Sequence, residues 1–401
     1  MFVQRSLLPE LKKYATSPEI LAVIGPRQSG KTTLVKKFVN DKEGVSEVTF
    51  ENEKMKKLFE EDIDIFIQKH VKRYNILFID EVQYVSNAGK NLKYIYDTQD
   101  IKIILTGSSA IDIAINSLSY LVGRILTFNL YPLSFHEIAQ HKHNINTYDF
   151  GAATVNILNE DLNTFIRYGG YPEVYIRETE EQKKKVLEGL FQTLLKRDIR
   201  RYFDIKDSSF INLLEYISLH NGKLLNIADV SRNTGISRHN IKEYITVLEQ
   251  AYVLKTIKPF YKNKKKEVVK HPEVFFIDNG LKNAVMETYS KQQLYDGYNY
   301  ESHVFSELIK YGHKPQFWRS KNKAEVDIVL TQDKKPVPIE IKRTLANNSI
   351  GKSMHSFIKK YNPDYAFMLS KTYEDTKTVR KTKVHFVPIV KTKKISRILR
   401  T

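Results

Sequence analysis

The chain has 401 residues, of which 64 are Lys or Arg and 46 are Asp or Glu, so its formal net charge is +18. Hydrophobic residues make up 41% of the chain, which supports sizeable cores and excludes disorder throughout. The absence of cysteine excludes disulfides, thiolate zinc sites and a cysteine nucleophile. No apolar run is long enough to cross a bilayer, and we expect no secretory segment. These features predict a cytoplasmic protein of two to four domains.

The positive charge is unevenly distributed along the chain. Residues 351–401 carry 13 Lys or Arg against 3 acidic residues, and a second group of lysines lies between 255 and 270. Such groups attract polyanions, so we expect a nucleic acid partner, with DNA favoured. An acidic membrane surface is the second choice. A solvated basic face that aids solubility is the alternative without a partner.

Residues 1–140 are predicted to form an α/β domain. Between residues 19 and 130, five short apolar runs alternate with amphipathic stretches, which is typical of parallel strands joined by crossover helices. The runs are EILAVIG, VSEVTFE, YNILFID, IKIILTG and RILTFNL.

A phosphate-binding loop follows the first apolar run. GPRQSGKT matches the pattern GxxxxGK[ST] and precedes the helical pattern TTLVKKFV. Glycines let backbone N–H groups close around phosphates, Lys31 reaches the β and γ oxygens, and Thr32 is a ligand of Mg²⁺. The predicted nucleotide-binding residues are Gly25, Pro26, Arg27, Gln28, Ser29, Gly30, Lys31, Thr32 and Thr33.

Two adjacent carboxylates complete the predicted ATP and Mg²⁺ site. Asp80 and Glu81 end the third apolar run. In P-loop enzymes the first acid holds the hydrated magnesium, and a following Glu can direct the water that attacks the γ-phosphate. We therefore assign Asp80, with Thr32, to the metal and Glu81 to catalysis, beside Lys31.

Further residues are predicted to sense phosphate or neutralise charge. Thr106 and Ser108, after the fourth run, carry hydroxyls suited to sensing the γ-phosphate. Arg124 is the best arginine to neutralise charge in the transition state, either in cis or across a subunit contact. An ordinary salt bridge is the alternative for Arg124.

Downstream of the first domain, residues 141–207 are predicted to form a helical connector or lid, with helices at 160–168 and 178–204. Residues 208–272 predict a winged helix-turn-helix, in which Ser237 caps the second helix and the lysine-rich segment after it serves as the wing. Near the start of that helix, Arg238, His239 and Lys242 would meet DNA. A domain that only packs between two larger ones is the alternative. The histidines of HEIAQHKH miss the HExxH spacing, so we reject a zinc site there.

Residues 273–401 resume an α/β rhythm and predict a second mixed sheet with an acidic constellation. Asp327 lies in AEVDIVL, and Glu340 and Lys342 lie in the strand PVPIEIK, where a period of two puts them on one face. Two carboxylates and a lysine are the layout of nucleases that hold Mg²⁺ and orient a water. Glu301 is the matching upstream acid. A relic fold without cleavage, or an exposed charged hairpin, is the alternative.

Several motifs together resemble a known family. They are GPRQSGKTT, FIDEVQ, LTGSSA, LVGRI, YPLSFHE, YGGYPEV, FIDNGL and the pair EVDIVL and IEIK. In this order the chain resembles bacterial and archaeal AAA-type ATPases of the P-loop superfamily, with a C-terminal domain of unknown function related to the restriction-endonuclease fold. The resemblance implies an ATPase core, a helical connector, a winged helix and a nuclease-like fold. It places the nucleotide roles on Gly30, Lys31, Thr32, Asp80 and Glu81.

The predicted function is Mg²⁺-dependent ATP binding and hydrolysis, coupled to a winged-helix and nuclease-like module that contacts DNA. Two alternatives remain open at this stage. One is an ATP-dependent switch with slow turnover that binds a protein partner. The other is an ATP-gated, metal-dependent nuclease. The sequence leaves open whether the chain forms a homo-oligomer.

Overall fold

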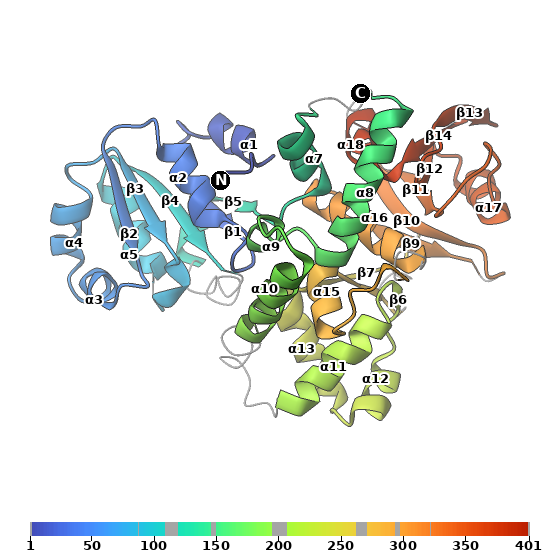
Figure 1. Ribbon diagram of the computed structural model, residues 1–401. Coiled ribbons are helices and arrows are strands. Elements are labelled where there is room, and N and C mark those ends of the chain that lie inside the picture. The colour runs from blue at the N-terminus through green and yellow to red at the C-terminus, as the bar shows by residue number, and fades with distance from the viewer. Residues whose placement is uncertain are drawn as a thin grey trace. The chain divides into compact units, whose positions relative to one another are not determined.

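The computed structural model describes residues 2–86, 88–108, 119–145, 150–194, 207–261, 271–292, 297–320 and 322–399 (Figure 1). The chain divides into two units, the first formed by residues 1–133 and 250–252, and the second by 134–249 and 253–401. Within the described ranges, no helix is both long enough and apolar enough to span a membrane.

The first unit contains a five-stranded sheet in which every pair of neighbours is parallel. Its strands, β1 (Ile20–Ile24), β2 (Val45–Thr49), β3 (Ile76–Asp80), β4 (Lys102–Gly107) and β5 (Ile125–Asn129), lie in the order β2-β3-β4-β1-β5. Each predicted apolar run forms one strand, so the predicted parallel sheet is confirmed. Because the carboxyl ends of parallel strands share one edge, the loops after β1, β3 and β4 meet there.

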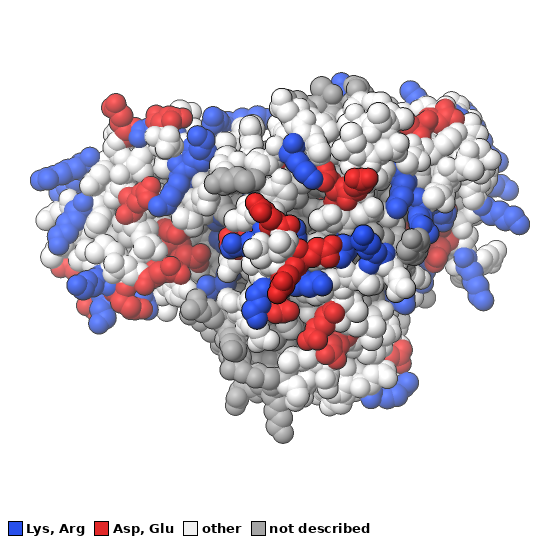
Figure 2. Space-filling view, in the orientation of Figure 1, with Lys and Arg blue, Asp and Glu red and all other residues white. Residues whose placement is uncertain are grey.

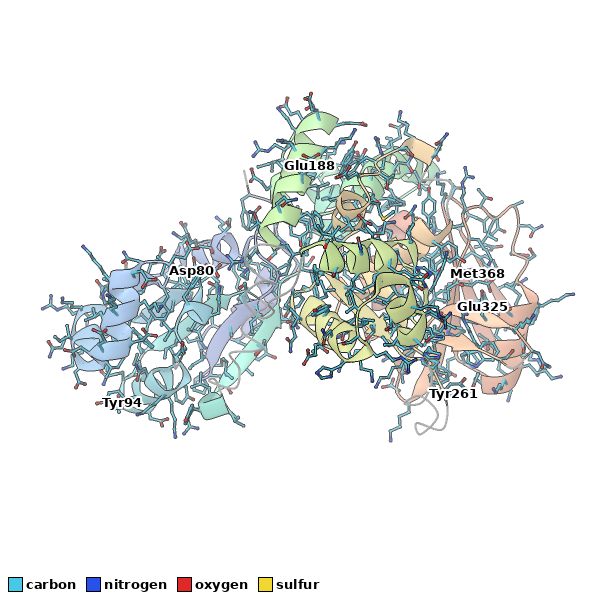
Figure 3. All side chains as sticks on the ribbon, turned by 90° about the horizontal axis from the view of Figure 1, so that it is seen from below. Asp80, Tyr94, Glu188, Tyr261, Glu325 and Met368 are labelled. Carbon is cyan, nitrogen blue, oxygen red and sulfur yellow. The ribbon has the colours of Figure 1, made fainter. Side chains whose placement is uncertain are left out.

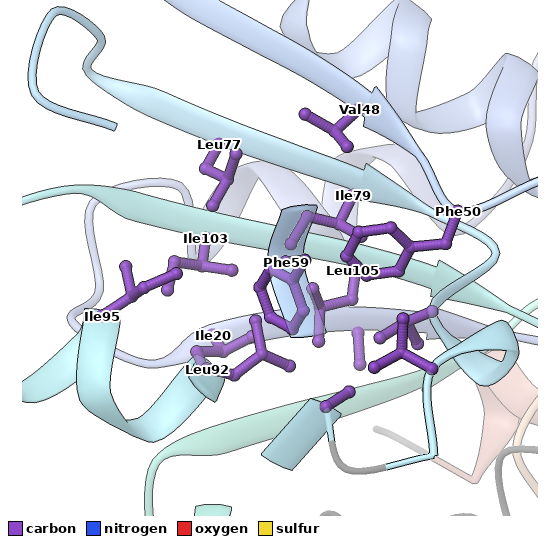
Figure 4. Close-up of a cluster of buried hydrophobic side chains, with 14 of the residues drawn as sticks. Ile20, Val48, Phe50, Phe59, Leu77, Ile79, Leu92, Ile95, Ile103 and Leu105 are labelled. Carbon is purple, nitrogen blue, oxygen red and sulfur yellow. The ribbon is translucent and has the colours of Figure 1, made fainter. Parts of the chain in front are cut away.

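Side chains alternate between the two faces of this sheet. Ile20 and Ala22 join a core with Phe59 and Leu92 (Figure 4), whereas Leu21 packs into the core on the opposite face. Burial on both faces explains why these strands read as continuous apolar runs. The accompanying helices are α1 (Leu8–Lys13), α2 (Lys31–Val39), α3 (Glu53–Glu61), α4 (Ile63–His70), α5 (Ala88–Thr98) and the short η1 (Val82–Tyr84) and η2 (Ser119–Leu121).

The second unit begins with helices. They are α7 (Phe135–His143), α8 (Ala152–Tyr168), α9 (Pro172–Tyr175), α10 (Glu180–Thr193) and, much later in the chain, α15 (Asn279–Val285). The predicted start of α8 at residue 160 is wrong. The helix begins at Ala152, and its first turns bury Val155 and Leu158 on the same helical face as Leu162. Part of the predicted helix 178–204 lies outside the described residues.

Three helices and a small sheet follow. They are α11 (Asp207–Leu219), α12 (Ile227–Thr234) and α13 (Arg238–Gln250), with β6 (Lys223–Leu224), β7 (Leu254–Ile257) and β8 (Glu273–Phe276) in the antiparallel order β6-β8-β7. The predicted turn lies at Gly235, which ends α12 in the left-handed conformation. Ser237 accepts a hydrogen bond from the Asn240 N–H, as its capping role requires. The lysine-rich segment 262–270, predicted as the wing, lies outside the described residues.

The predicted second mixed sheet is confirmed and has six strands. Its members are β9 (Gln316–Arg319), β10 (Glu325–Gln332), β11 (Lys335–Ile341), β12 (Tyr365–Ser370), β13 (Asp375–Val379) and β14 (Thr382–Pro388). The order is β13-β14-β12-β11-β10-β9, and β12 is parallel to both of its neighbours. The associated helices are α16 (Gly297–Lys310), α17 (Lys352–Tyr361), η5 (Ile389–Lys391) and α18 (Lys393–Ile398).

Candidate nucleotide-binding site

The loop between β1 and α2 has the backbone of a phosphate-binding loop. Gly30 has φ 91°, a conformation that side chains with a Cβ rarely adopt, and α2 begins directly after it. Gln28 is also left-handed, with φ 59°. At Gly25, a Cβ would lie 2.0 Å from the Leu130 carbonyl oxygen, so only glycine fits. The N-terminus of α2 therefore opens on a tight loop, which is the arrangement that favours phosphate.

The predicted phosphate ligands gather in and beside this loop. Lys31 is buried, and its Nζ donates to the carbonyl oxygens of Gly25 at 3.1 Å and Pro26 at 2.9 Å. Arg27 is half-buried and contacts the Tyr84 hydroxyl at 3.4 Å. Thr33 lies exposed in the first turn of α2. The ammonium of Lys31 thus lies inside the loop, while Thr33 points to solvent.

Asp80 ends β3 (Figure 3) and is held by two hydroxyls. Thr32 Oγ1 donates to Asp80 Oδ1 at 2.9 Å, and Thr106 Oγ1 donates to the same oxygen. Burial raises the pKa of Asp80, against the lowering effect of these hydrogen bonds. The hydroxyl of Thr32 and the carboxylate of Asp80 are oxygen ligands of the kind that Mg²⁺ prefers, so this pair fits the ion.

Glu81 has an unusual backbone and a fixed side chain. Its φ is 57°, and its N–H donates to Thr106 Oγ1 at 3.2 Å. The Gln83 amide donates to the Glu81 carboxylate, and Gln83 Oε1 accepts from the Ser108 N–H at 3.2 Å. Gln83 therefore ties the predicted catalytic carboxylate to the backbone at the end of β4. The sequence analysis missed Gln83, although it lies in the motif FIDEVQ.

Arg124 lies at the other edge of the sheet from the phosphate loop. Its carbonyl oxygen accepts from the N–H of Ile20, the first residue of β1, whereas the loop follows the last residue of β1. The Arg124 guanidinium forms an ion pair with Asp97 at 3.0 Å and lies over the Tyr96 ring. Within one chain this matches the salt-bridge alternative. A role across a subunit contact stays a prediction.

The second predicted constellation is partly assembled in the C-terminal sheet. The antiparallel register of β10 and β11 makes Asp327 and Glu340 cross-strand neighbours. Lys342 Nζ lies 2.9 Å from Glu340 Oε1, and Asp327 Oδ2 accepts from the Ile341 N–H at 2.7 Å. Glu340 is buried, and its Oε2 has no hydrogen-bond partner among the residues that the structure describes.

Glu301 and two acids that the sequence analysis missed extend this constellation. Burial raises the pKa of Glu301 well above its usual value, and repulsion from Asp327 and Glu273 adds to it. Burial also raises the pKa of Asp327 and, against the attraction of Arg319, that of Glu273 to about 8. Arg319 pairs with Glu273 at 2.9 Å and with Glu325 at 3.4 Å. The carboxylates thus repel one another in a poorly solvated region.

Among the described residues, however, no three His, Cys, Asp or Glu side chains lie close enough together to hold a metal ion. On α7, where the sequence analysis rejects a zinc site, His143 pairs with Asp161 at 2.5 Å.

The predicted nucleic-acid contacts are exposed but less concentrated than the sequence indicates. Ser237, Arg238, His239 and Lys242 are all exposed at the start of α13, and His239 pairs with Glu243 at 3.3 Å. In the basic C-terminal region, Lys391 and Lys394 both pair with Glu374. On the face shown in Figure 2, basic side chains are interspersed with acidic ones.

Comparison with protein families divides the chain into three matches. Residues 17–139 match an AAA domain, residues 159–292 match a domain of unknown function (DUF8612), and residues 296–391 match another (DUF4143). The first match coincides with the parallel sheet and its phosphate loop. It supports an AAA-type P-loop ATPase domain that binds ATP. Neither of the other two descriptions mentions a nuclease, so that likeness stays a prediction.

Related proteins extend over most of the chain. An uncharacterized protein of Haemophilus influenzae is 24% identical over 82% of this chain and 84% of its own length, and the uncharacterized protein MJ1544 of Methanocaldococcus jannaschii is 26% identical over 93% and 87%. Among solved structures, the Walker-type ATPase PABY2304 of Pyrococcus abyssi has a TM-score of 0.48 at 16% identity, covering 71% of this chain and 96% of that one. The Aeropyrum pernix ORC1 protein in complex with DNA has a TM-score of 0.33 at 11% identity, covering 73% and 95%.

Proposed function

We propose that the protein is a Mg²⁺-dependent ATPase whose nucleotide state controls a DNA-contacting module in the second unit. The observation that carries the proposal is the hydrogen-bond network that links the phosphate loop to the two acids. Thr32 and Thr106 both donate a hydrogen bond to Asp80, and Thr106 also accepts one from the Glu81 N–H. The meeting of the loops after β1, β3 and β4 at one edge of the sheet supports a joint site for ATP and Mg²⁺ there.

Each residue has one role in this proposal. Lys31 binds the β and γ oxygens of ATP, Thr32 and Asp80 hold Mg²⁺, and Glu81 orients the attacking water. Ser108, which follows β4, senses the γ-phosphate. When bound, Mg²⁺ neutralises charge on the phosphate oxygens.

The module controlled by this site is proposed to follow the predicted division, with a helical connector at 141–207, a winged helix at 208–272 and a nuclease-like fold at 273–401. Supporting the winged helix, α12 and α13 are joined by a short turn and followed by the β6-β8-β7 sheet. The exposed Arg238 and Lys242 lie on the first turns of α13, where a recognition helix contacts DNA.

The test is ATP hydrolysis by the wild type and by Glu81→Gln, with duplex, branched and single-stranded DNA at two salt concentrations. Loss of the base is expected to lower kcat by roughly 10²-fold or more while ATP still binds. DNA stimulation that weakens with salt and disappears in Glu81→Gln supports the coupled ATPase. Turnover that is equal in both proteins contradicts it.

A protein switch with slow turnover is the second candidate, because Gln83 already holds the Glu81 carboxylate. Its signature is nearly stoichiometric ATP binding with little hydrolysis under any DNA condition. Lys31→Ala is the control for both candidates, because it removes the ammonium from the loop and is expected to abolish ATP binding.

An ATP-gated nuclease is the third candidate, favoured by the juxtaposition of Asp327, Glu340 and Lys342. It requires nicking of supercoiled DNA in the presence of Mg²⁺ that is lost in Asp327→Asn while ATP hydrolysis is retained. The matched control is Asp333→Asn, which changes an exposed acid in the turn after the same strand. If the wild type and both variants nick DNA equally, the nicking comes from a contaminating nuclease.

A further inference from the structure

Arg5, which precedes the first helix, is buried against the phosphate loop. Its Nη1 donates to the Ser29 carbonyl oxygen at 2.7 Å, and its Nη2 donates to the Tyr131 carbonyl oxygen at 2.5 Å. One rigid guanidinium thus joins the loop to a segment more than 100 residues later in the chain. The planar fork of arginine suits this bridging role, because its donors are fixed relative to one another.

The segment that Arg5 reaches, residues 130–133, leads out of the first unit. The Leu130 N–H donates to the Ile24 carbonyl oxygen at 2.7 Å, directly before the loop. The Leu130 carbonyl lies so close to Gly25 that a side chain there would clash. Leu130 and Tyr131 are therefore held against the phosphate loop by packing and by hydrogen bonds.

The chain enters the second unit at Ser134, which caps α7 by a reciprocal hydrogen-bonded pair with Glu137. The N–H of Phe135, the first residue of α7, donates to Glu307 Oε2 at 3.0 Å. Glu307 is buried with Lys310 at 3.2 Å and also accepts from the Tyr311 hydroxyl at 2.5 Å. These bonds fix the start of α7 to α16, the helix that also carries Glu301.

We propose that Arg5 is a positioning residue that transmits the nucleotide state of the phosphate loop to segment 130–133, and through the chain to α7. The proposal rests on ATP binding as the proposed function. Nucleotide binding restrains the backbone at Ser29, and the Arg5 guanidinium transmits this restraint to the backbone at Tyr131. The short connection from Tyr131 to Ser134 then transmits it to the start of α7, which is hydrogen-bonded to α16. Arg5 touches neither phosphate nor metal in this scheme.

The experiment compares backbone hydrogen exchange in the full-length wild type and Arg5→Met, with and without a non-hydrolysable ATP analogue. In the wild type we expect the analogue to slow exchange in residues 130–143 about fivefold. In Arg5→Met the analogue is expected to bind roughly tenfold more weakly and, at saturation, to leave exchange in 130–143 unchanged. Lys12→Met, which removes an exposed cation from the same region, should behave as the wild type.

Two further variants separate transmission from a loss of folding. Arg5→Lys keeps the charge but lacks the rigid fork, so it should retain ATP binding with reduced protection of 130–143. Glu307→Ala should leave ATP affinity and the protection of 130–133 intact while removing that of 134–143. Protection at saturation that is the same in Arg5→Met, Arg5→Lys and the wild type overturns the proposal. A wild type that binds no ATP overturns the proposed function and Arg5's role with it.

Discussion

At the scale of single residues, Glu81 combines a strained backbone with a restrained carboxylate. A left-handed φ at a residue with a Cβ costs free energy, and such strain is stored where the surrounding structure imposes it. Here Thr106 holds the N–H and Gln83 holds the carboxylate. For the proposed catalytic role of Glu81, this arrangement corresponds to a resting state in which Gln83 keeps the carboxylate from the attacking water.

Gln83→Ala should therefore raise basal ATP turnover by roughly 2- to 10-fold, because the carboxylate is then free to reach the water. Steady-state hydrolysis without DNA measures the effect. Gln99→Ala, which changes a glutamine after α5, serves as the control. A fall in kcat would show instead that Gln83 orients the carboxylate for catalysis.

His303 makes the stability of the second unit sensitive to acid. Burial, with repulsion from Lys310, lowers the pKa of His303 to about 3. The folded state keeps this ring neutral, whereas the unfolded chain binds a proton below about pH 6.5, so falling pH favours unfolding. Between pH 7.5 and 5 this residue should account for about 2 kcal/mol of lost unfolding free energy.

The measurement is urea unfolding of His303→Gln and the wild type at both pH values. Between pH 7.5 and pH 5, the unfolding free energy of the variant should fall by about 2 kcal/mol less than that of the wild type, whatever the variant's stability at pH 7.5. The exposed His355 supplies the control, since His355→Gln should track the wild type. An unchanged pH dependence in His303→Gln rules the assignment out.

The sequence predicts the residues whose partners lie within one motif and misses those whose partners are distant. Lys31 and Thr32 are predicted as nucleotide-site residues because a loop of fixed length and composition dictates their chemistry. Arg5 and Glu273 are not, because an arginine before a helix or an acid at a strand start carries no local signal of its partner. Gln83 is the intermediate case, visible in a motif but without an assigned role.

At the scale of secondary-structure elements, the end of α8 is fitted against the start of α15. A Cβ on Gly280 would lie 2.1 Å from the Tyr168 carbonyl oxygen, and the Gly170 N–H donates to the buried Asp278 at 2.7 Å. The motifs YGGYPEV and FIDNGL, noted separately in the sequence, are thus the two halves of one joint. Periodicity predicts the last turns of α8, but neither the short α15 nor the contact between the two helices.

Gly280→Ala should therefore destabilise the second unit by roughly 2–4 kcal/mol, because the peptide backbone at Tyr168 must move. Gly189→Ala is the matched change in α10, where, among the described residues, the added Cβ would meet no heavy atom within 4 Å beyond the nearby backbone of its own helix. It should stabilise the protein by up to about 1 kcal/mol through helix propensity. Thermal unfolding of both variants tests the pair, and equal midpoints would contradict the fitted joint.

At the scale of the whole molecule, the charge of +18 is a sum over many sites, and some of them are neutralised locally. Lys391 and Lys394 share Glu374, and Arg319 joins two acids. The net charge predicts attraction to polyanions but not where they bind. Ion pairs between residues far apart in sequence cannot be foreseen from composition, so the basic C-terminal region is less available than its residue count indicates.

If α13 contacts DNA, the dependence of affinity on salt should show it. Replacing both Arg238 and Lys242 by Ala should lower the slope of log affinity against log salt by about 2, because two phosphate contacts are lost. Fluorescence anisotropy with a labelled duplex measures the slope. The control removes two exposed lysines elsewhere, Lys12 and Lys185. A slope that changes equally in both double variants would place the contact outside α13.

The bond between the Phe135 N–H and Glu307 joins residues 172 positions apart. During synthesis the strands and phosphate loop of the first unit are all available once residue 133 has been made, whereas α7 must wait for α16 to supply its acceptor. At ribosomal speeds of about 5–20 residues per second that interval lasts roughly 10–35 seconds. The parallel sheet of the first unit can therefore form early in synthesis, whereas the start of α7 gains the Glu307 acceptor only after α16 has been made.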